Sequence, residues 1–514
     1  MKSVLAVMAA FLFLSCSTNM TVYNFTERTT SLPTPTAEKL PSSWKGFNLL
    51  NMFYLGDNRQ GNFKEEKFKM ISELGFNFVR IPIDYRIIIN FNNWNNINER
   101  AVRQIDKAIE YGIKHDIHVC LNFHRAPGYT VAHPPERTNL WTDKRPQEAF
   151  AFLWGYFAER YKNVPNEYLS FNLINEPANV DEAAYAAVVK KAADAIWAKD
   201  PKRLIIADGL DWGTTPSNMI KELGIAQATR GYQPFTLTHY KAEWVEGSQD
   251  YFLPQWPAVI LPRFLYGLEK DEVTRSIYNI EHNFAEAYYL DINIGTVSHE
   301  ARLVVKADGT EIFNRLFRSE AGRGEWTTVV YRREWNIYQN IFNRDYRMQI
   351  PAGTKLLTIE VTDGDWMTVN NMQFTSVSGN GIAFNLTPNS IDWNAAIPPV
   401  KINADGKIVS QGQTIDRSWL LTDSFQQWDE LMRNNGGAMV GEWGAYNKTP
   451  HNVVLRWMED CLEIFKELGM GWALWNFNGS FGILNSERAD VVYEDFHGYK
   501  LDRKMLDLLL RYLD

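Results

Sequence analysis

The stretch YLSFNLINEP, residues 168–177, joins an apolar run to a polar end. The run has the composition of a buried β-strand, and Asn175, Glu176 and Pro177 close it. An ionised carboxylate at the end of a buried strand is costly unless a partner compensates its charge. Glu176 is therefore either a structural ion-pair partner or a group held for chemistry. The tripeptide alone does not decide between the two, because it is common by chance.

Apolar runs of this kind alternate with helical periodicity along most of the chain. We expect eight strands, at residues 44–51, 76–82, 117–124, 168–177, 203–209, 234–240, 438–444 and 471–477. Nearly continuous apolar strands are typical of a parallel sheet that is covered on both faces. Eight strand–helix units in order predict the α/β class and a (β/α)8 TIM barrel. A doubly wound open sheet is the alternative, but no glycine-rich phosphate loop follows any of these strands.

The long segment between the sixth and seventh predicted strands changes character. Residues 274–388 alternate apolar and polar side chains, and we expect turns at Asp308-Gly309 and Asp363-Gly364. The pattern predicts a β-sandwich inserted into a barrel loop, so that residues 42–273 and 389–514 make up the barrel. Five aromatic residues of this insert form either a platform for stacking sugars or the sandwich core: Trp326, Tyr331, Trp335, Tyr338 and Trp366.

The first residues resemble an export signal. Lys2 precedes an apolar stretch at residues 4–14 that is too short to span a bilayer, and Phe13-Leu14-Ser15-Cys16 resembles a bacterial lipobox. We therefore expect a signal peptide over residues 1–16, lipidation of Cys16 and a flexible tether over residues 17–41, which is rich in Thr, Ser and Pro. The protein would then be exported and anchored by lipid at the outer membrane or cell surface. The alternative is a periplasmic or secreted protein.

Charge and cysteine content exclude several classes of function. The chain has 53 basic and 61 acidic residues, for a net charge of −8, and no strongly basic block, so we expect no nucleic-acid partner. Cys16, Cys120 and Cys461 are too few for a disulfide framework and lack metal-type spacing. We expect no metal, no cofactor, a monomer, and a membrane contact only through the N-terminal lipid. Aromatic residues make up 14% of the chain, which suits a large core or a sugar-binding surface.

Polar or amphipathic side chains close six of the predicted strands, at the end where barrel enzymes carry their active sites. They are Arg80, His124, Asn175 with Glu176, His239 with Tyr240, Glu442 and Trp475. Taken singly, each has a structural reading, as an ion-pair partner, a core histidine or a packed ring. Together, two carboxylates across a cleft suit glycoside hydrolysis, in which one carboxyl is protonated and the other is ionised.

This set resembles glycoside hydrolase family 5, the cellulase family of retaining barrel enzymes, over residues 44–266 and 400–514. In that family an Arg ends strand two, a His strand three, Asn-Glu-Pro strand four, and His-Tyr or His-x-Tyr strand six. A Glu follows on strand seven and a Trp on strand eight. The resemblance implies that Glu176 is the acid/base and Glu442 the nucleophile. The substrate-binding residues would be Arg80, His124, Asn175, His239, Tyr240 and Trp475, together with the loop residue Trp244.

We expect an exported retaining glycoside hydrolase that cleaves a β-glucan, similar to an endo-β-1,4-glucanase. A β-mannan or a β-1,3-glucan remains an alternative substrate, because loop aromatics such as Trp141, Trp244 and Trp256 would set it by shape. A non-catalytic surface protein that binds glycans is the alternative of another class. The presence of both glutamates argues against it.

Replacing Cys16 tests the export hypothesis. Cys16→Ser removes the thiol that would carry lipid, so the membrane-bound fraction of the protein should fall sharply while the soluble fraction rises. Cell fractionation with immunodetection measures both, and Cys120→Ser is the matched control. A membrane-bound fraction unchanged in Cys16→Ser would contradict the lipobox interpretation.

Overall fold

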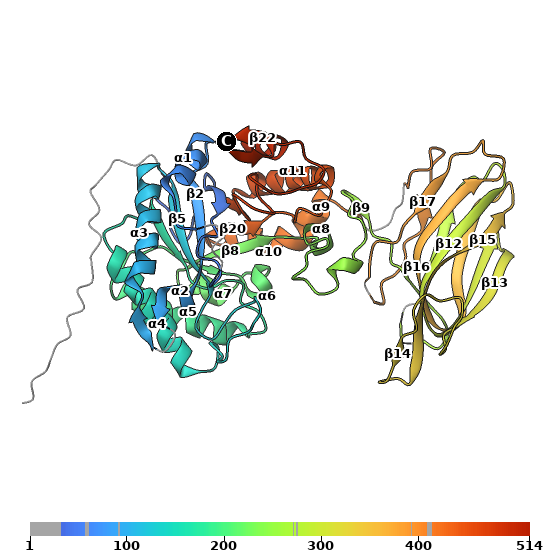
Figure 1. Ribbon diagram of the computed structural model, residues 1–514, viewed down its shortest axis with the longest axis horizontal. Helices are drawn as coiled ribbons and strands as arrows, with labels where there is room; N and C mark the ends of the chain where they lie inside the picture. Colours follow the sequence, from blue (N-terminus) through green and yellow to red (C-terminus); the bar gives the residue numbers. More distant parts are fainter. Residues whose placement is uncertain are drawn as a thin grey trace, which may run out of the picture.

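The computed structural model describes residues 32–56, 61–90, 93–270, 272–273, 276–391, 393–408 and 414–513. Cys16, the predicted signal peptide and residue 274, the predicted start of the insert, lie outside the described residues. Within them, the chain forms a closed eight-stranded barrel with surrounding helices and a separate nine-stranded sheet, joined by the segment around β9 (Figure 1). No helix of the described residues is long and apolar enough to cross a membrane.

The barrel is parallel throughout and confirms the predicted (β/α)8 fold. Its strands in spatial order are β1 (Lys45–Asn48), β2 (Phe78–Asp84), β5 (His118–Arg125), β6 (Leu169–Asn172), β7 (Ile205–Asp208), β8 (Ala226–Gly231), β20 (Ala438–Trp443) and β21 (Trp472–Leu474). Pairing of β1 with β21 closes the ring. The larger helices around it are α1 (Glu65–Glu73), α3 (Glu99–Lys114), α4 (Lys144–Tyr161), α5 (Glu182–Trp197), α10 (Gln426–Arg433), α11 (His451–Leu468) and α12 (Arg503–Leu510).

Shorter elements decorate the barrel. They are α2 (Tyr85–Ile88), β3 (Ile89–Asn90), β4 (Asn93–Ile97), α6 (Leu210–Gly213), α7 (Asn218–Glu222), α8 (Phe235–Thr238), η1 (Ser248–Asp250), α9 (Arg417–Trp419), η2 (Leu420–Phe425), β22 (Glu494–Phe496) and β23 (Tyr499–Leu501). They lie in the segments that connect consecutive barrel strands or that follow the last one.

Side chains that point into the barrel form an apolar layer and a polar layer. Phe78, Cys120 and Ile206 belong to a buried apolar cluster inside the ring. Two residues further along the same strands come Arg80, Asn122 and Asp208, all buried. Because strand side chains alternate between faces, residues two apart share the inner face. The sequence therefore fills the lower barrel with apolar groups and gathers polar groups near the carboxyl ends of the strands.

The sixth strand is not where the sequence indicated it. Residues 234–240, PFTLTHY, were expected as a strand, but Phe235–Thr238 is the short helix α8. The sixth barrel strand is β8, Ala226–Gly231, with the sequence AQATRG. Alanine, glutamine and glycine have low β-propensity, and burial between β7 and β20 overrides that preference. His239 and Tyr240 consequently follow a helix and do not end a strand.

The nine-stranded sheet is built on three long strands, β12 (Tyr288–Ala307), β15 (Ile337–Ile350) and β16 (Leu356–Ser376). The shorter strands are β10 (Phe264–Tyr266), β11 (Ile277–Glu281), β13 (Thr310–Arg318), β14 (Tyr331–Arg332), β17 (Phe384–Leu386) and β18 (Val400–Lys401). This β domain encloses a hydrophobic core of its own. The alternating sequence patterns within β12 and within β16 suggested separate strands. Each is one continuous strand, because bulges bend it and do not end it.

The two Asp-Gly dipeptides of the β domain have different roles. Asp308-Gly309 forms the expected turn between β12 and β13, with positive φ at both residues. The prediction of a turn at Asp363-Gly364 was wrong, because this pair lies inside β16 at a register shift against β12. Gly364 has a φ of 84°, and a Cβ there would lie 2.2 Å from the carbonyl oxygen of Glu300. A glycine in a strand pattern marked a bulge.

The two chains that connect the barrel and the β domain are hydrogen-bonded to each other. β9 (Ala258–Val259), on the way out of the barrel, pairs with β19 (Thr414–Ile415), on the way back. Further in, β11 pairs with β18, which follows the long sheet strands in sequence. The long excursion therefore leaves and re-enters the barrel at closely spaced points.

Substituting the two glycines separately tests the bulge. Gly309→Ala should cost about 1–2 kcal/mol of unfolding free energy for positive φ alone, because a Cβ there meets open space. Gly364→Ala should cost about 1–3 kcal/mol more, because its Cβ overlaps the β12 backbone. Denaturant unfolding of the two variants measures the difference. An equal loss in both would contradict the steric role of Gly364.

Candidate active site

Five ionisable side chains lie together at the carboxyl end of the barrel. They are Arg80, Glu176, Asp208, Arg230 and Glu442, called here the buried charge cluster. The side chain of Glu176 is 15% exposed and each of the other four is 3% exposed or less. Charges so deeply buried are stable only when paired and hydrogen-bonded.

Arg80 connects the second strand to the fourth and seventh strands. Its Nη1 donates to Oε1 of Glu442 at 2.5 Å, and its Nη2 donates to Oδ1 of Asn175 at 2.9 Å. Asn172 and Asn48 accept from the remaining donors of the guanidinium, at 2.9 and 3.0 Å. Arg80 thus provides Glu442 with a fixed positive partner.

Glu442 faces the barrel interior because of a bulge in β20. Met439 belongs to the inner apolar cluster, so strict alternation would point Gly441 inward and Glu442 outward. A register shift between Val440 and Glu442 reverses this and places Glu442 beside Arg230 of β8. The bulge therefore aims the predicted nucleophile into the site, as bulges near active sites commonly do.

A tyrosine hydroxyl also reaches Glu442, but it is not the predicted one. Tyr232 donates to Oε2 of Glu442 at 3.2 Å, whereas the sequence placed Tyr240 in the site. Burial and the nearby Glu442 charge raise the pKa of Tyr232 well above its usual range, so the phenol stays protonated. Tyr232 follows β8 directly, and misplacing the sixth strand transferred its role to Tyr240.

Glu176 lies in a strained loop beyond β6. The strand ends at Asn172, and Glu176 has a φ of 49°. Its N–H donates to Oδ2 of Asp208 at 2.9 Å, and its carbonyl accepts from the hydroxyl of Tyr129 at 2.5 Å. These two bonds over-determine a backbone conformation that side-chain-bearing residues rarely adopt, and such strain is common at functional sites.

The carboxyl group of Glu176 has a high proton affinity. Burial raises its pKa, the charge of Glu442 raises it further, and Arg230 opposes both, with a resulting pKa of about 7. Arg80 and Arg230 carry two positive charges, and Glu442 and Asp208 carry two negative charges. A protonated Glu176 leaves the cluster neutral, whereas an ionised Glu176 leaves an uncompensated buried charge.

Arg230, absent from the sequence-based site, contacts all three carboxylates of the cluster. Its Nε donates to Oε1 of Glu176 at 2.9 Å, its Nη2 lies 3.3 Å from Oε1 of Glu442, and Nη2 also donates to Oδ2 of Asp208. The sequence at the end of the sixth strand is Arg230-Gly231-Tyr232, so an arginine occupies the first position of the His-x-Tyr pattern. The spacing of Arg230 two residues before a tyrosine is the sequence signal that could have identified both residues as part of the site.

Nδ1 of His124 and Nδ2 of Asn175 have no hydrogen-bond partner among the described residues, although Nδ1 of His124 lies 3.9 Å from Oε1 of Glu442. Burial, followed by the charges of Arg80 and Arg230, lowers the pKa of His124 well below its usual range, so the ring is neutral. The ring stacks near Trp475, with centroids 5.6 Å apart. Unsatisfied buried polar groups next to an aromatic ring suit a polar ligand with apolar faces.

The other predicted contacts lie at the rim. His239 packs against Phe235, with ring centroids 3.8 Å apart, and burial lowers its pKa to about 3. Trp244 is 58% exposed and leans edge-on against Tyr446. Trp256, expected among the loop aromatics that shape the cleft, is buried and donates to Asp460. Trp244 is therefore available to a ligand, and Trp256 is not.

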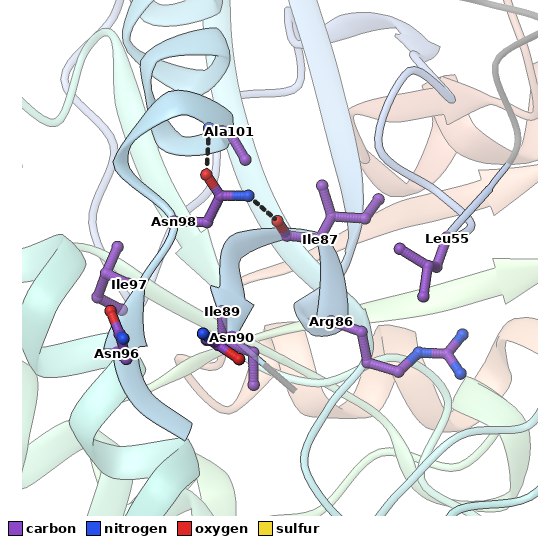
Figure 2. A pocket seen from close by; sticks show the side chains of 9 residues that line it. All are labelled: Leu55, Arg86, Ile87, Ile89, Asn90, Asn96, Ile97, Asn98 and Ala101. Carbon is purple, nitrogen blue, oxygen red and sulfur yellow. Dashed lines mark hydrogen bonds between the residues drawn. The ribbon is translucent and has the colours of Figure 1, made fainter. Parts of the chain in front are cut away.

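Two pockets lie outside the buried charge cluster. The first, of about 610 Å³, opens beyond β2 between Arg86, Asn90, Asn96 and Asn98 (Figure 2). Figure 2 shows Asn98 turned toward Ile87 and Ala101, to which it is hydrogen-bonded, while Arg86 extends away from it. The second, of about 320 Å³, includes Asn48, the residue that accepts from Arg80. Amides dominate the polar lining of both.

The chain is similar to known proteins over part of its length. A family model described as cellulase (glycosyl hydrolase family 5) matches residues 36–229, a range that ends one residue before Arg230. Endoglucanase C of Acetivibrio thermocellus is 30% identical over 193 residues, 36% of this chain and 55% of that protein. Cellodextrinase A of Ruminococcus flavefaciens is 27% identical over 213 residues, 39% of this chain and 61% of that protein.

The chain spans about half the length of the curated relatives it matches. A crystal structure described as a glycoside hydrolase is similar over 91% of this chain and 98% of its own, with 26% sequence identity and a TM-score of 0.59. The matched segment contains Arg80, His124, Asn175 and Glu176. Residues 36–229 of this chain are therefore similar to the cellulase domain of glycosyl hydrolase family 5.

Proposed function

We propose that this protein hydrolyses β-glycosidic bonds of a polysaccharide with retention of anomeric configuration, and that its substrate is a β-1,4-glucan. The observation that carries the proposal is the pairing of Glu176, whose pKa is raised to about 7, with an Arg80-bound Glu442 in one buried cluster. Retaining glycosidases need one carboxyl of each kind. Similarity to proteins named endoglucanase favours a glucan over a mannan.

In the first step, Glu176 gives its proton to the glycosidic oxygen as the bond from that oxygen to the anomeric carbon breaks. An Oε of Glu442 attacks the anomeric carbon from the opposite side and forms a glycosyl ester. In the second step, the Glu176 carboxylate takes a proton from water, the water oxygen attacks the anomeric carbon, and Glu442 leaves as a carboxylate. Two inversions give net retention.

The neighbouring groups favour Glu176 as the acid/base and Glu442 as the nucleophile. Arg80 and Tyr232 hold Glu442 in position to attack. The free Nδ2 of Asn175 is available to a hydroxyl beside the reacting carbon, and Trp475 offers a face for the sugar ring. Because Glu176 must be protonated at the start, turnover of substrates with poor leaving groups should decline as pH rises through about 7.

Removing Glu176 tests the proposal. Glu176→Ala should lower hydrolysis of a natural β-glucan by about 10²–10⁴-fold, since general acid catalysis is worth that much. An aryl glycoside with a good leaving group needs little protonation, so its first step should be far less affected. Added azide should restore turnover, because an anion attacks the intermediate without base assistance, and the product should be the β-glycosyl azide.

Glu311→Ala, an exposed position on β13, is the matched control and should behave as the parent protein. Proton NMR of the first product should show the β-anomer. Equal losses on both substrates without azide rescue would show that Glu176 is not the acid/base, and an α-anomer as first product would remove Glu442 as nucleophile.

We further propose that the β domain binds glycan through the β14–β15 hairpin. Tyr331 and Trp335 are 46% and 62% exposed there, and the ring of Tyr338 lies 5.0 Å from that of Tyr331. Trp326 packs on the domain core and Trp366 packs against Trp393, so these two of the five aromatics are less available. Exposed aromatic rings are suited to the apolar faces of sugars.

The double variant Tyr331→Ala/Trp335→Ala tests this surface. Retention on insoluble glucan should fall about fivefold or more, because each lost ring contact removes about 0.5–1.5 kcal/mol. Turnover of a small aryl glycoside should not change. Trp393→Ala, an exposed tryptophan of the same domain, is the control. Unchanged retention in the double variant, or an equal loss in the control, would contradict a hairpin site.

A further inference from the structure

Arg230 is a buried cation shared by both reacting glutamates. Through Nε it contacts Glu176, and through Nη2 it contacts Glu442 and Asp208. Its side chain is 2% exposed. Among the contacts of the described residues, Arg80 reaches Glu442 and Asp208 but not Glu176. Arg230 is therefore the arginine that bridges the two carboxylates.

The surroundings of Arg230 hold its guanidinium in one orientation. A Cβ on Gly213 would lie 2.9 Å from Cγ of Arg230, and one on Gly441 would lie 3.0 Å from its Nη1. Oδ1 of Asn175 accepts from Nη2 at 2.8 Å, and the carbonyl of Thr229 accepts from Nη1 at 3.2 Å. Close packing and five polar partners fix the planar group, so it is preorganised.

Building on the proposed function, we propose that Arg230 is a positioning residue and the common counterion of Glu176 and Glu442 through both steps of the reaction. At the start the negative charge lies on Glu442. When Glu176 loses its proton and Glu442 becomes an ester, that charge lies on Glu176. In the second step Glu176 regains a proton from water, the ester bond breaks, and the charge returns to Glu442.

A shared counterion removes the need for the protein to reorganise when the charge moves. The negative charge transfers from one side of the guanidinium to the other while the cation stays fixed. Fixed charges aimed at both locations stabilise each transition state without reorganisation at the moment of reaction. Asp208, which binds Arg230 and does not react, keeps the cation in place.

The charge of Arg230 also acts on the protonation of Glu176. The groups that face this pair are Arg80, His124, Tyr129, Tyr185, Asp208, Tyr232 and Glu442. Arg230 and its hydrogen bond lower the pKa of Glu176, against burial, Glu442 and Asp208, which raise it. Loss of the cation should therefore raise the pKa of Glu176 further.

Arg230→Gln removes the charge and keeps polar atoms in the space. Its pH profile on a natural glucan should extend upward, with the basic limb shifted by about one to three pH units. Burst kinetics on an aryl glycoside separate the two steps, and both should slow about 10²–10³-fold. A loss confined to one step would overturn the shared role.

Arg203→Gln is the matched control. Arg203 is another buried arginine, bound to Asp200 and to backbone carbonyls below the site. Its loss should lower stability without moving the basic limb or changing the ratio of the two steps. If Arg203→Gln moves them as Arg230→Gln does, Arg230 has only a structural role.

Asp208→Asn is a second variant of nearly identical shape, should Arg230→Gln fold poorly. It removes a negative charge and frees the Arg230 charge, so the pKa of Glu176 should fall, opposite to the first variant. Carbon-13 NMR titration of glutamate-labelled protein measures this without substrate, with Glu176→Gln assigning the resonance. Unmoved titrations in the variants overturn the inference. Shifted titrations in a protein that cleaves no β-glycan uphold the charge coupling and reject the proposed function.

Discussion

The structure at the carboxyl end of the barrel depends on one constraint. The five ionisable groups of the buried charge cluster must neutralise one another. Isolated, any one of these charges would cost several kcal/mol or shift its pKa until it became neutral. The two arginines balance the carboxylates of Glu442 and Asp208, so no positive charge remains to balance an ionised Glu176. Burial and the charge of Glu442 raise the pKa of Glu176. The proton affinity of Glu176 is thus raised before any substrate arrives.

The polar layer around the cluster follows from that balance. Asn48, Asn172 and Asn175 accept hydrogen bonds from Arg80, and Asn172 donates to Asp208. An amide supplies donor and acceptor without adding charge, so it satisfies a buried ion pair and leaves the sum unchanged. The apolar layer beneath, with Phe78 and Ile206, keeps water from the cluster from below. The inward-facing positions of each strand therefore supply both the apolar core of the barrel and the polar groups of the site.

Most of the barrel and three of the five members of the buried charge cluster were predictable from the sequence. Seven strands, together with Arg80, Glu176 and Glu442, followed from apolar runs with polar ends. Asp208 lies at the end of the fifth predicted strand, but no motif around it in the sequence marks it as a site residue. Arg230 and Tyr232 were missed because AQATRG has weak β-propensity, whereas PFTLTHY alternates like a strand and lies in a helix. Residues 226–231 form the strand because they are buried between β7 and β20, and this tertiary effect cannot be read from local sequence.

The β domain shows why a long insertion need not disturb this balance. Closing a flexible loop of that length costs entropy that grows only slowly with length. Here β9 pairs with β19, and β11 pairs with β18, so the two connecting chains are held together before they reach the barrel. The insertion therefore leaves and rejoins the connection between β8 and β20 at the β9–β19 pair. The strands β8 and β20 carry Arg230 and Glu442, and their direct pairing is what keeps the guanidinium beside the carboxylate.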